Sequence, residues 1–297
     1  RSTVKITNRY GFTNLDELAF SWQLLENGMP IETGRIADVS VLPRAHASVK
    51  VPYHQTLSDG KDYHLLISAR LKQSTLWAPK GFEIAWEQFE LKHGFFAATE
   101  APQNTSEIKV KEAGHLLTLT GEHTVIKVDT SSAAVTSLSM DGKELLKQPL
   151  RPNFYKAVND NQYANRFAGR LGVWKDAANR LKLERSDTQK LQDGVLLTLR
   201  YQLPIAQASL TVSYKLDTAG RFHCHYSYHG AEGPNLPKFG ATLAVADAFS
   251  QVEWFGRGSH ETYCDRKTSG KFGVYQLPVD AFSYQYIQPQ DNGNHTD

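Results

Sequence analysis

Apolar and polar side chains alternate with a period of two along the first part of the chain. The alternation is clear in residues 20–24 and 63–69, and turn pairs such as Asn27-Gly28 separate such runs. Turn signals recur about every 8–12 residues without a helical period between them, which is typical of small sandwiches. The pattern predicts an immunoglobulin-like β-sandwich over residues 1–98, with Trp22 in its core.

Longer alternating runs follow a polar, proline-containing stretch at residues 99–106, which we interpret as a linker. Two of these runs, residues 209–216 and 221–228, form a predicted β-hairpin. One short helical pattern covers residues 174–181, and strands do not alternate with helices. We therefore predict an all-β fold in which a second, larger antiparallel β-sandwich occupies residues 107–297.

Composition narrows the classes of function. Hydrophobic residues make up 40% and charged residues 22% of the 297 residues, which is ordinary for a chain with two apolar cores. The net charge of +2 is not concentrated in a basic run, so we expect no nucleic-acid partner. The apolar stretches are too short to cross a bilayer, so we expect no membrane partner either. No signal peptide is present, but a truncated N-terminus would lack one in any case, so its absence does not indicate the compartment; we favour the cytoplasm, with the periplasm as the alternative.

Cysteine and histidine positions give little support for a metal site. Cys224 and Cys264 stand alone, which favours two free thiols over a disulfide framework. His223 and His225 share one face of a predicted strand, with His229 nearby, and such pairs bind zinc when further ligands complete the site. A third ligand is not evident, so we favour ordinary strand histidines and expect no metal and no cofactor in this chain.

Five short strings occur along the chain in a recognisable order: residues 9–15, 152–161, 236–240, 254–266 and 289–293. In that order they resemble the C-terminal region of bacterial β-galactosidases of glycoside hydrolase family 2. The resemblance implies that residues 107–297 form part of a galactose mutarotase-like supersandwich, truncated at its C-terminus. Because Arg1 is not an initiator methionine and the chain stops soon after residue 293, we expect a slice of a larger enzyme.

The resemblance implies a parent enzyme that hydrolyses terminal β-D-galactosides, such as lactose, by a retaining mechanism. That mechanism needs two carboxyl groups about 5–5.5 Å apart. In the family the acid/base glutamate follows an asparagine in a barrel domain, and no Asn-Glu pair occurs in this chain. We therefore expect no catalytic residue here and an inactive isolated chain. The resemblance places Mg²⁺, with Na⁺ as a further ion, in the absent barrel. It also implies that the galactoside, the other domains and a homo-oligomer are partners.

The segment at residues 157–172, which contains the polar run 159–162, resembles a family loop that borders the active-site mouth. Asp160 and Asn161 are therefore candidates for binding sugar hydroxyls, and the alternative is that Asp160 caps local backbone amides. Gln162 stands where the family has a third acidic residue, which weakens a cation-binding or sugar-binding role for that position. Lys156 likewise replaces an arginine of the family.

A second motif lies in the 254–266 string, in which Ser259 replaces a proline of the family. Its Gly-x-Gly lacks a third glycine and a following helix, so it does not predict a dinucleotide site. We expect Asp265 and Arg266 to belong to an ion-paired network that fastens a strand end, with substrate contact as the alternative. The candidate structural residues are Trp254, Gly256, Gly258, Glu261, Tyr263, Asp265 and Arg266.

A different class of function also fits the sequence. A large sandwich can act as a carbohydrate-binding module without hydrolase activity, because exposed aromatic rings stack on sugars. Trp254 and Tyr284 are the aromatic candidates for such a surface. A barrel domain with an Asn-Glu pair in the same parent polypeptide would favour the enzyme over the binding module.

Overall fold

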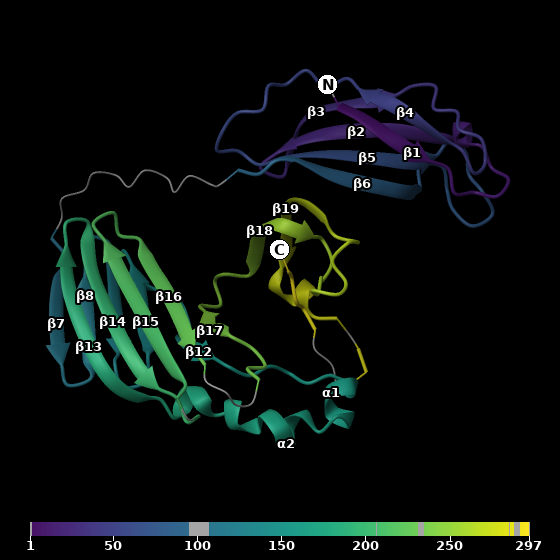
Figure 1. The fold of residues 1–297 in the computed structure, drawn as a ribbon. Coiled ribbons are helices and arrows are strands. Elements are labelled where there is room, and N and C mark those ends of the chain that lie inside the picture. Colours follow the sequence, from purple (N-terminus) through teal and green to yellow (C-terminus); the bar gives the residue numbers. More distant parts are fainter. Residues whose placement is uncertain are drawn as a thin grey trace. The chain divides into compact units, whose positions relative to one another are not determined.

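The computed structural model describes residues 2–94, 107–205, 207–230, 235–284, 286–287 and 292–296. Antiparallel strands dominate these residues, which confirms the predicted all-β class (Figure 1). The chain forms two compact units. The first holds the described residues of 2–94, 251–283 and 293–296, and the second holds those of 107–250 and 284–292. The expected linker, residues 99–106, lies outside the described residues.

The first unit contains a four-stranded sheet and a two-stranded sheet that enclose two apolar clusters. Asn27 and Gly28 both adopt positive φ, 48° and 79°, as a tight hairpin turn requires. Trp22 is 3% exposed and Leu24 is 0% exposed, so the prediction that Trp22 lies in the core is confirmed. The four-stranded sheet has the order β3 (Met29–Ile36), β2 (Leu18–Glu26), β5 (Tyr63–Leu71), β6 (Glu83–Lys92), and the other pairs β1 (Ser2–Thr7) with β4 (His46–Val51).

A later hairpin, β18 (Gln251–Gly258) with β19 (Lys271–Pro278), belongs to the first unit. The Gln88 side chain donates to the Phe272 carbonyl at 2.9 Å and accepts from the Phe272 amide at 2.7 Å. Lys271 Nζ lies 2.6 Å from a carboxylate oxygen of Glu83. The segment that the sequence assigned to the second sandwich is thus tied through β19 to strand β6.

The second unit consists mainly of two antiparallel sheets. The predicted hairpin is confirmed as β15 (Ser209–Asp217) and β16 (Phe222–His229), which pair from Ser209 with His229 to Leu216 with Phe222. The larger sheet has the order β17 (Gly240–Val245), β12 (Leu146–Asn153), β10 (Ala134–Met140), β9 (Thr124–Asp129), β8 (Leu116–Thr120), β7 (Lys109–Ala113), with β11 (Lys143–Glu144) on β10. The smaller has the order β13 (Lys182–Leu191), β14 (Gly194–Gln202), β15 (Ser209–Asp217), β16 (Phe222–His229).

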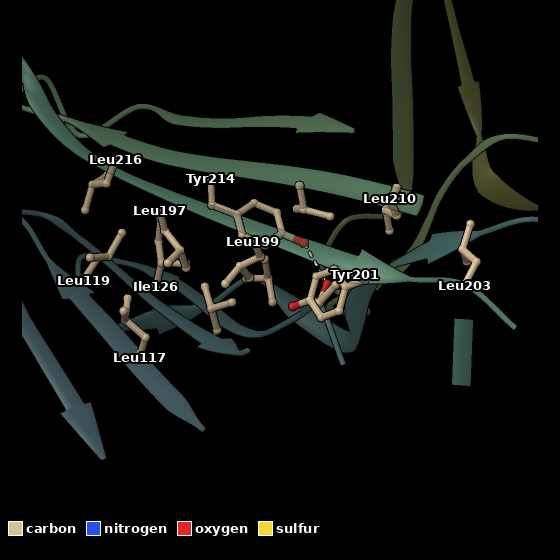
Figure 2. Close-up of a cluster of buried hydrophobic side chains, with 14 of the residues drawn as sticks. Leu117, Leu119, Ile126, Leu197, Leu199, Tyr201, Leu203, Leu210, Tyr214 and Leu216 are labelled. Carbon is tan, nitrogen blue, oxygen red and sulfur yellow. Dashed lines mark hydrogen bonds between the residues drawn. The ribbon is translucent and has the colours of Figure 1, made fainter. Parts of the chain in front are cut away.

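Leucine side chains from both sheets fill the core of the second unit (Figure 2). Leu119 of β8 and Leu199 of β14 are both 0% exposed. Two buried tyrosines satisfy their hydroxyls on backbone carbonyls: Tyr201 donates to Thr130 at 2.6 Å and Tyr214 donates to Ala133 at 2.7 Å. Hydrogen bonds of this kind let a polar group lie inside an apolar core at low cost.

Helical structure is short and begins earlier in the chain than expected. The turns are α1 (Asp160–Ala164), α2 (Phe167–Leu171), η2 (Gly172–Trp174) and η3 (Ala177–Asn179), with η1 (Leu15–Glu17) and η4 (Val279–Phe282) in the first unit. The helical pattern predicted at 174–181 coincides with the short 3-10 turns η2 and η3, whereas α1 and α2, within residues 157–172, were not predicted. Among the described residues, no helix is long and apolar enough to cross a membrane.

Candidate functional site

The polar segment after β12 is held at intervals by buried aromatic side chains. Phe154 is 1% exposed and Trp174 is 1% exposed, and their ring centroids lie 6.0 Å apart. Phe167 is 6% exposed and packs on Tyr155 with a centroid distance of 5.6 Å. These anchors join the segment to the core of the second unit, so the polar residues between them are presented on a fixed backbone.

A capping box sets the start of helix α1. The Asn159 side chain accepts from the Gln162 amide at 3.0 Å, and the Gln162 side chain accepts from the Asn159 amide at 3.3 Å. This reciprocal pair satisfies two backbone donors that a helix N-terminus leaves free. Gln162, which departs from the family pattern, therefore has a structural role. The expected alternative role for Asp160, capping of backbone amides, is filled by Asn159.

The two candidate sugar-binding residues lie in the first turn of α1. Asp160 and Asn161 are both exposed, and their side chains form no hydrogen bond with another described residue. A carboxylate and an amide in this state offer acceptors and donors to a hydroxylated ligand without first breaking a protein contact. The geometry thus supports Asp160 and Asn161 as candidate ligand-binding residues. That the ligand is a sugar is a proposal.

Glu261 is the centre of the second candidate constellation. Its side chain is 2% exposed, and one carboxylate oxygen lies 2.9 Å from Arg266 Nη2. The other accepts from the Gly293 amide at 3.0 Å and from the Tyr263 hydroxyl at 3.3 Å. One buried carboxylate therefore connects the 254–266 motif to the 289–293 motif. We call Glu261, Tyr263, Arg266 and Gly293 the Glu261 clamp.

Thr262 extends this connection along the chain. Its amide donates to the Asn294 carbonyl at 2.7 Å, and the Asn294 side chain donates to the Thr262 carbonyl at 2.8 Å. The Thr296 amide donates to Thr262 Oγ1 at 2.8 Å. Thr262 is 0% exposed, so these bonds are shielded from water. The segment 293–296 is thereby fixed to residues 261–262 by main-chain and side-chain bonds together.

An aromatic cluster lies beside the clamp. Trp254 packs on Tyr275, Phe282 and His295, with centroid distances of 5.5, 5.4 and 4.9 Å, and its Nε1 donates to the Arg257 carbonyl at 3.0 Å. Burial lowers the pKa of His295, although the charge of Glu261 acts in the opposite direction. Trp254 is thus occupied by internal packing, which does not favour it as a free sugar-stacking platform.

The structure also shows why the motif contains a glycine next to this cluster. A β-carbon at Gly258 would lie 2.7 Å from the Tyr275 ring and 3.0 Å from Trp254, which is closer than side chains tolerate. Gly256 pairs with Gly273 in the same hairpin. Asp265, in contrast, is exposed and pairs with no cation among the described residues. The ion-paired network predicted for Asp265 and Arg266 is therefore built on Glu261 and Arg266.

The remaining sequence candidates do not assemble into a site. His223 Nε2 lies 2.9 Å from Asp217, and Arg221 Nε lies 2.7 Å from the same oxygen. No group of three potential metal ligands occurs within the part of the chain that the structure describes. Cys224 and Cys264 are free thiols, as predicted. Tyr284 is half-buried and stacks on Tyr286 at 6.2 Å.

The fold and the two constellations define an all-β protein whose polar segments are held on rigid sheets. Comparison with protein families shows which class of protein this chain belongs to. Residues 120–297 match the family described as β-galactosidase small chain, and residues 4–92 match the one described as β-galactosidase, domain 4. The first match covers more than half of the chain, so the chain belongs to the β-galactosidase small-chain family.

Curated relatives agree with this assignment. A β-galactosidase of Priestia megaterium is 29% identical over 294 residues, which cover 98% of this chain and 28% of that protein. A β-galactosidase of Streptococcus thermophilus is 26% identical, and the match covers 28% of that protein. A β-galactosidase of Halalkalibacterium halodurans is 25% identical, and the match covers 30% of that protein. The chain thus spans less than a third of the length of these relatives.

Proposed function

We propose that this chain is a non-catalytic part of a β-galactosidase that hydrolyses terminal β-D-galactosides, such as lactose, by a retaining mechanism. The observation that carries the proposal is the coverage: similarity extends over 98% of the chain but over only 28% of the Priestia megaterium relative. The sequence lacks the Asn-Glu pair that the family uses for acid/base catalysis. The catalytic carboxylates are then supplied by another part of the parent protein.

Within that enzyme the segment around α1 forms part of the pocket wall. Asp160 and Asn161 offer hydrogen bonds to sugar hydroxyls, and the capping box together with the anchors Phe154 and Phe167 holds their backbone in place. Neither residue transfers a proton, because the acid and the nucleophile of a retaining glycosidase are a separate pair of carboxyl groups. Their contribution is the binding and orientation of the substrate.

Metal ions enter this proposal only through the rest of the parent enzyme. The described residues contain no group of three His, Cys, Asp or Glu side chains that would hold an ion, so the donor set here does not fit Mg²⁺. We place the Mg²⁺ and Na⁺ that the resemblance implies in the barrel domain of the parent enzyme, and we propose that the parent enzyme is a homo-oligomer.

The first experiment compares the isolated chain with the parent enzyme on a nitrophenyl galactoside. We expect hydrolysis by the parent and only background with residues 1–297. Activity of the isolated chain that survives repurification and disappears when one of its own residues is replaced would contradict the proposal. A parent enzyme that is folded but inactive on galactosides and active on another glycoside would refute the substrate class.

The second experiment tests the pocket wall. The double variant Asp160→Ala, Asn161→Ala in the parent enzyme should raise KM more than it lowers kcat if the lost contacts are equal in the ground state and the transition state. Asp176→Ala, an exposed acid further along the same segment, is the matched control and should leave both constants unchanged. Kinetics of the double variant that equal those of the control would reduce α1 to a scaffold.

A further inference from the structure

Strand β1 (Ser2–Thr7) has one free edge. It pairs with β4 alone, and β6 (Glu83–Lys92) pairs with β5 alone, among the described strands. The unpaired backbone groups of an edge strand are a template for another strand. Natural sandwiches protect such edges by covering them, by placing charges on them or by breaking them with bulges. The side of the first unit between β1 and β6 therefore carries two strand edges that pair with no other described strand.

Two neighbouring hollows of about 650 and 410 Å³ follow this side of the first unit. They share the residues Ile6, Thr7, Arg9, Phe20, Ala69 and Ala85, so together they form one elongated groove beside β1. We call it the β1 groove.

The floor of the β1 groove is the apolar interior of the sandwich. Phe20 and Ala69 are each 7% exposed and belong to a core cluster. Ile6 of β1 packs against the same cluster but is only partly buried. Phe89 of β6, which lines the groove, is 37% exposed although it pairs with the buried Leu65. Ile6 and Phe89 are thus left partly uncovered along one side of the sandwich, and further apolar side chains would complete their packing.

We propose that an extended segment of the parent polypeptide, lying outside residues 1–297, adds to the free edge of β1 as a strand and places alternate apolar side chains in the β1 groove. The proposal rests on the proposed function, because it requires the chain to be part of a longer protein. The relatives provide the necessary length, since the chain covers only 28–30% of the first three.

An extended strand fits this place better than a helix or a loop does. β1 contributes a regular six-residue edge, and only an extended backbone matches its spacing of amide and carbonyl groups. Main-chain hydrogen bonds then provide affinity, and the groove selects side chains at alternate positions. The occupant is therefore a strand with a period-two apolar pattern, and a covalent connection within the parent protein supplies it at high effective concentration.

The test uses the 297-residue chain and synthetic fluorescent peptides that tile the parent sequence outside it. The peptides are about 12 residues long, so that each exceeds a typical strand. We expect one stretch to bind, measured by anisotropy, and to slow hydrogen exchange of the β1 amides. Ala85→Arg puts a charge into the groove at an exposed position and should weaken binding by about tenfold or more. Leu76→Arg, at a fully exposed position outside the groove, should bind like the wild type.

Melting curves of both variants establish that they fold. If no peptide binds, and the β1 amides exchange equally fast in the parent protein and in the 297-residue chain, the proposal is overturned. Concentration-dependent dimerisation of the 297-residue chain that Ala85→Arg abolishes would assign the groove to a second copy and also overturn it. If a peptide binds the β1 groove but the parent protein has no galactosidase activity, the proposed function is refuted and the proposed occupation of the groove is not.

Discussion

Replacement of Glu261 tests whether one buried carboxylate holds the C-terminal motif in place. In Glu261→Ala, the Gly293 amide and Arg266 Nη2 lose an acceptor at 3.0 and 2.9 Å, and the Tyr263 hydroxyl loses one at 3.3 Å. Glu261 is 2% exposed, whereas the Arg266 side chain is 54% exposed. The guanidinium therefore regains water, while the Gly293 amide is left with weaker access to it.

The magnitude follows from this asymmetry. Removing one partner of a fully buried ion pair costs about 3–5 kcal/mol, but an exposed pair contributes only about 0–1 kcal/mol. A backbone donor left without its acceptor costs about 1–3 kcal/mol. Because Arg266 is half exposed, we expect Glu261→Ala to lower the free energy of unfolding by about 2–4 kcal/mol. Glu261→Gln keeps an acceptor oxygen but loses the charge, so it should cost about half as much.

Urea unfolding followed by circular dichroism measures the loss, and hydrogen exchange locates it. With a slope of about 2 kcal/mol per molar urea, the midpoint of the first unit should fall by roughly 1–2 M. The amides of Thr262, Gly293 and Thr296 should exchange faster in the variant than in the wild type. Asp265→Ala is the matched control, because this acid is exposed, and it should change the stability by less than about 0.5 kcal/mol.

Two results would refute this reasoning. If Glu261→Ala unfolds at the same urea concentration as the wild type, with unchanged exchange in residues 261–296, the clamp does not stabilise the motif. If Asp265→Ala is as destabilising as Glu261→Ala, then the ion pair involves the acid that the sequence first suggested. In that case the geometry around Arg266 would differ from the one described above.

Further expectations concern the second unit. Leu199→Ala, at a side chain that is 0% exposed, should cost about 3–5 kcal/mol in urea unfolding, whereas an exposed leucine should cost little. Asn159→Ala removes one half of the capping box and should destabilise helix α1 locally by about 1 kcal/mol, seen as faster exchange with an unchanged global midpoint. Burial alone would raise the pKa of Asp217, but hydrogen bonds from His223 and Arg221 outweigh it and lower that pKa to about 2. The wild type should therefore exceed Asp217→Asn in stability above about pH 4, and the difference should vanish as the pH falls towards 2; a constant difference would contradict this.

The strands were predictable because their chemistry is local. Side chains on opposite faces of a half-buried strand meet different environments, so alternation survives in the sequence, as in the hairpin of β15 and β16. Trp22 was predictable for the same reason. The helical turns were not, because α1 and α2 have five residues each and are too short to show a 3.6-residue period. The sequence signal for α1 was the capping pair Asn159 and Gln162, but Gln162 was interpreted only as the replacement of an acidic residue of the family.

The partner of Arg266 could not be predicted from the motif. Glu261 and Asp265 lie five residues and one residue before it, and a flexible arginine reaches either acid. The choice depends on Gly293, which is 32 residues beyond Glu261 and brings its amide to the carboxylate. A contact that closes a long loop leaves no trace in the local pattern, because its energy is gained only after the rest of the fold has brought the two segments together.

The same argument explains why residues 251–283, which come late in the sequence, belong to the first compact unit. A two-stranded hairpin alone is marginal in water, so β18 and β19 need a surface to pack on. Strand β6 provides that surface. Its Gln88 satisfies both backbone groups of Phe272, and its Glu83 pairs with Lys271 at 2.6 Å. Lys271 Nζ also lies 4.9 Å from the Trp86 ring centroid, and this cation–π contact adds to the ion pair with Glu83. A fragment cut after β6 would therefore lose these partners of Gln88 and Glu83, and residues 251–283 would lose the support that keeps their hairpin folded.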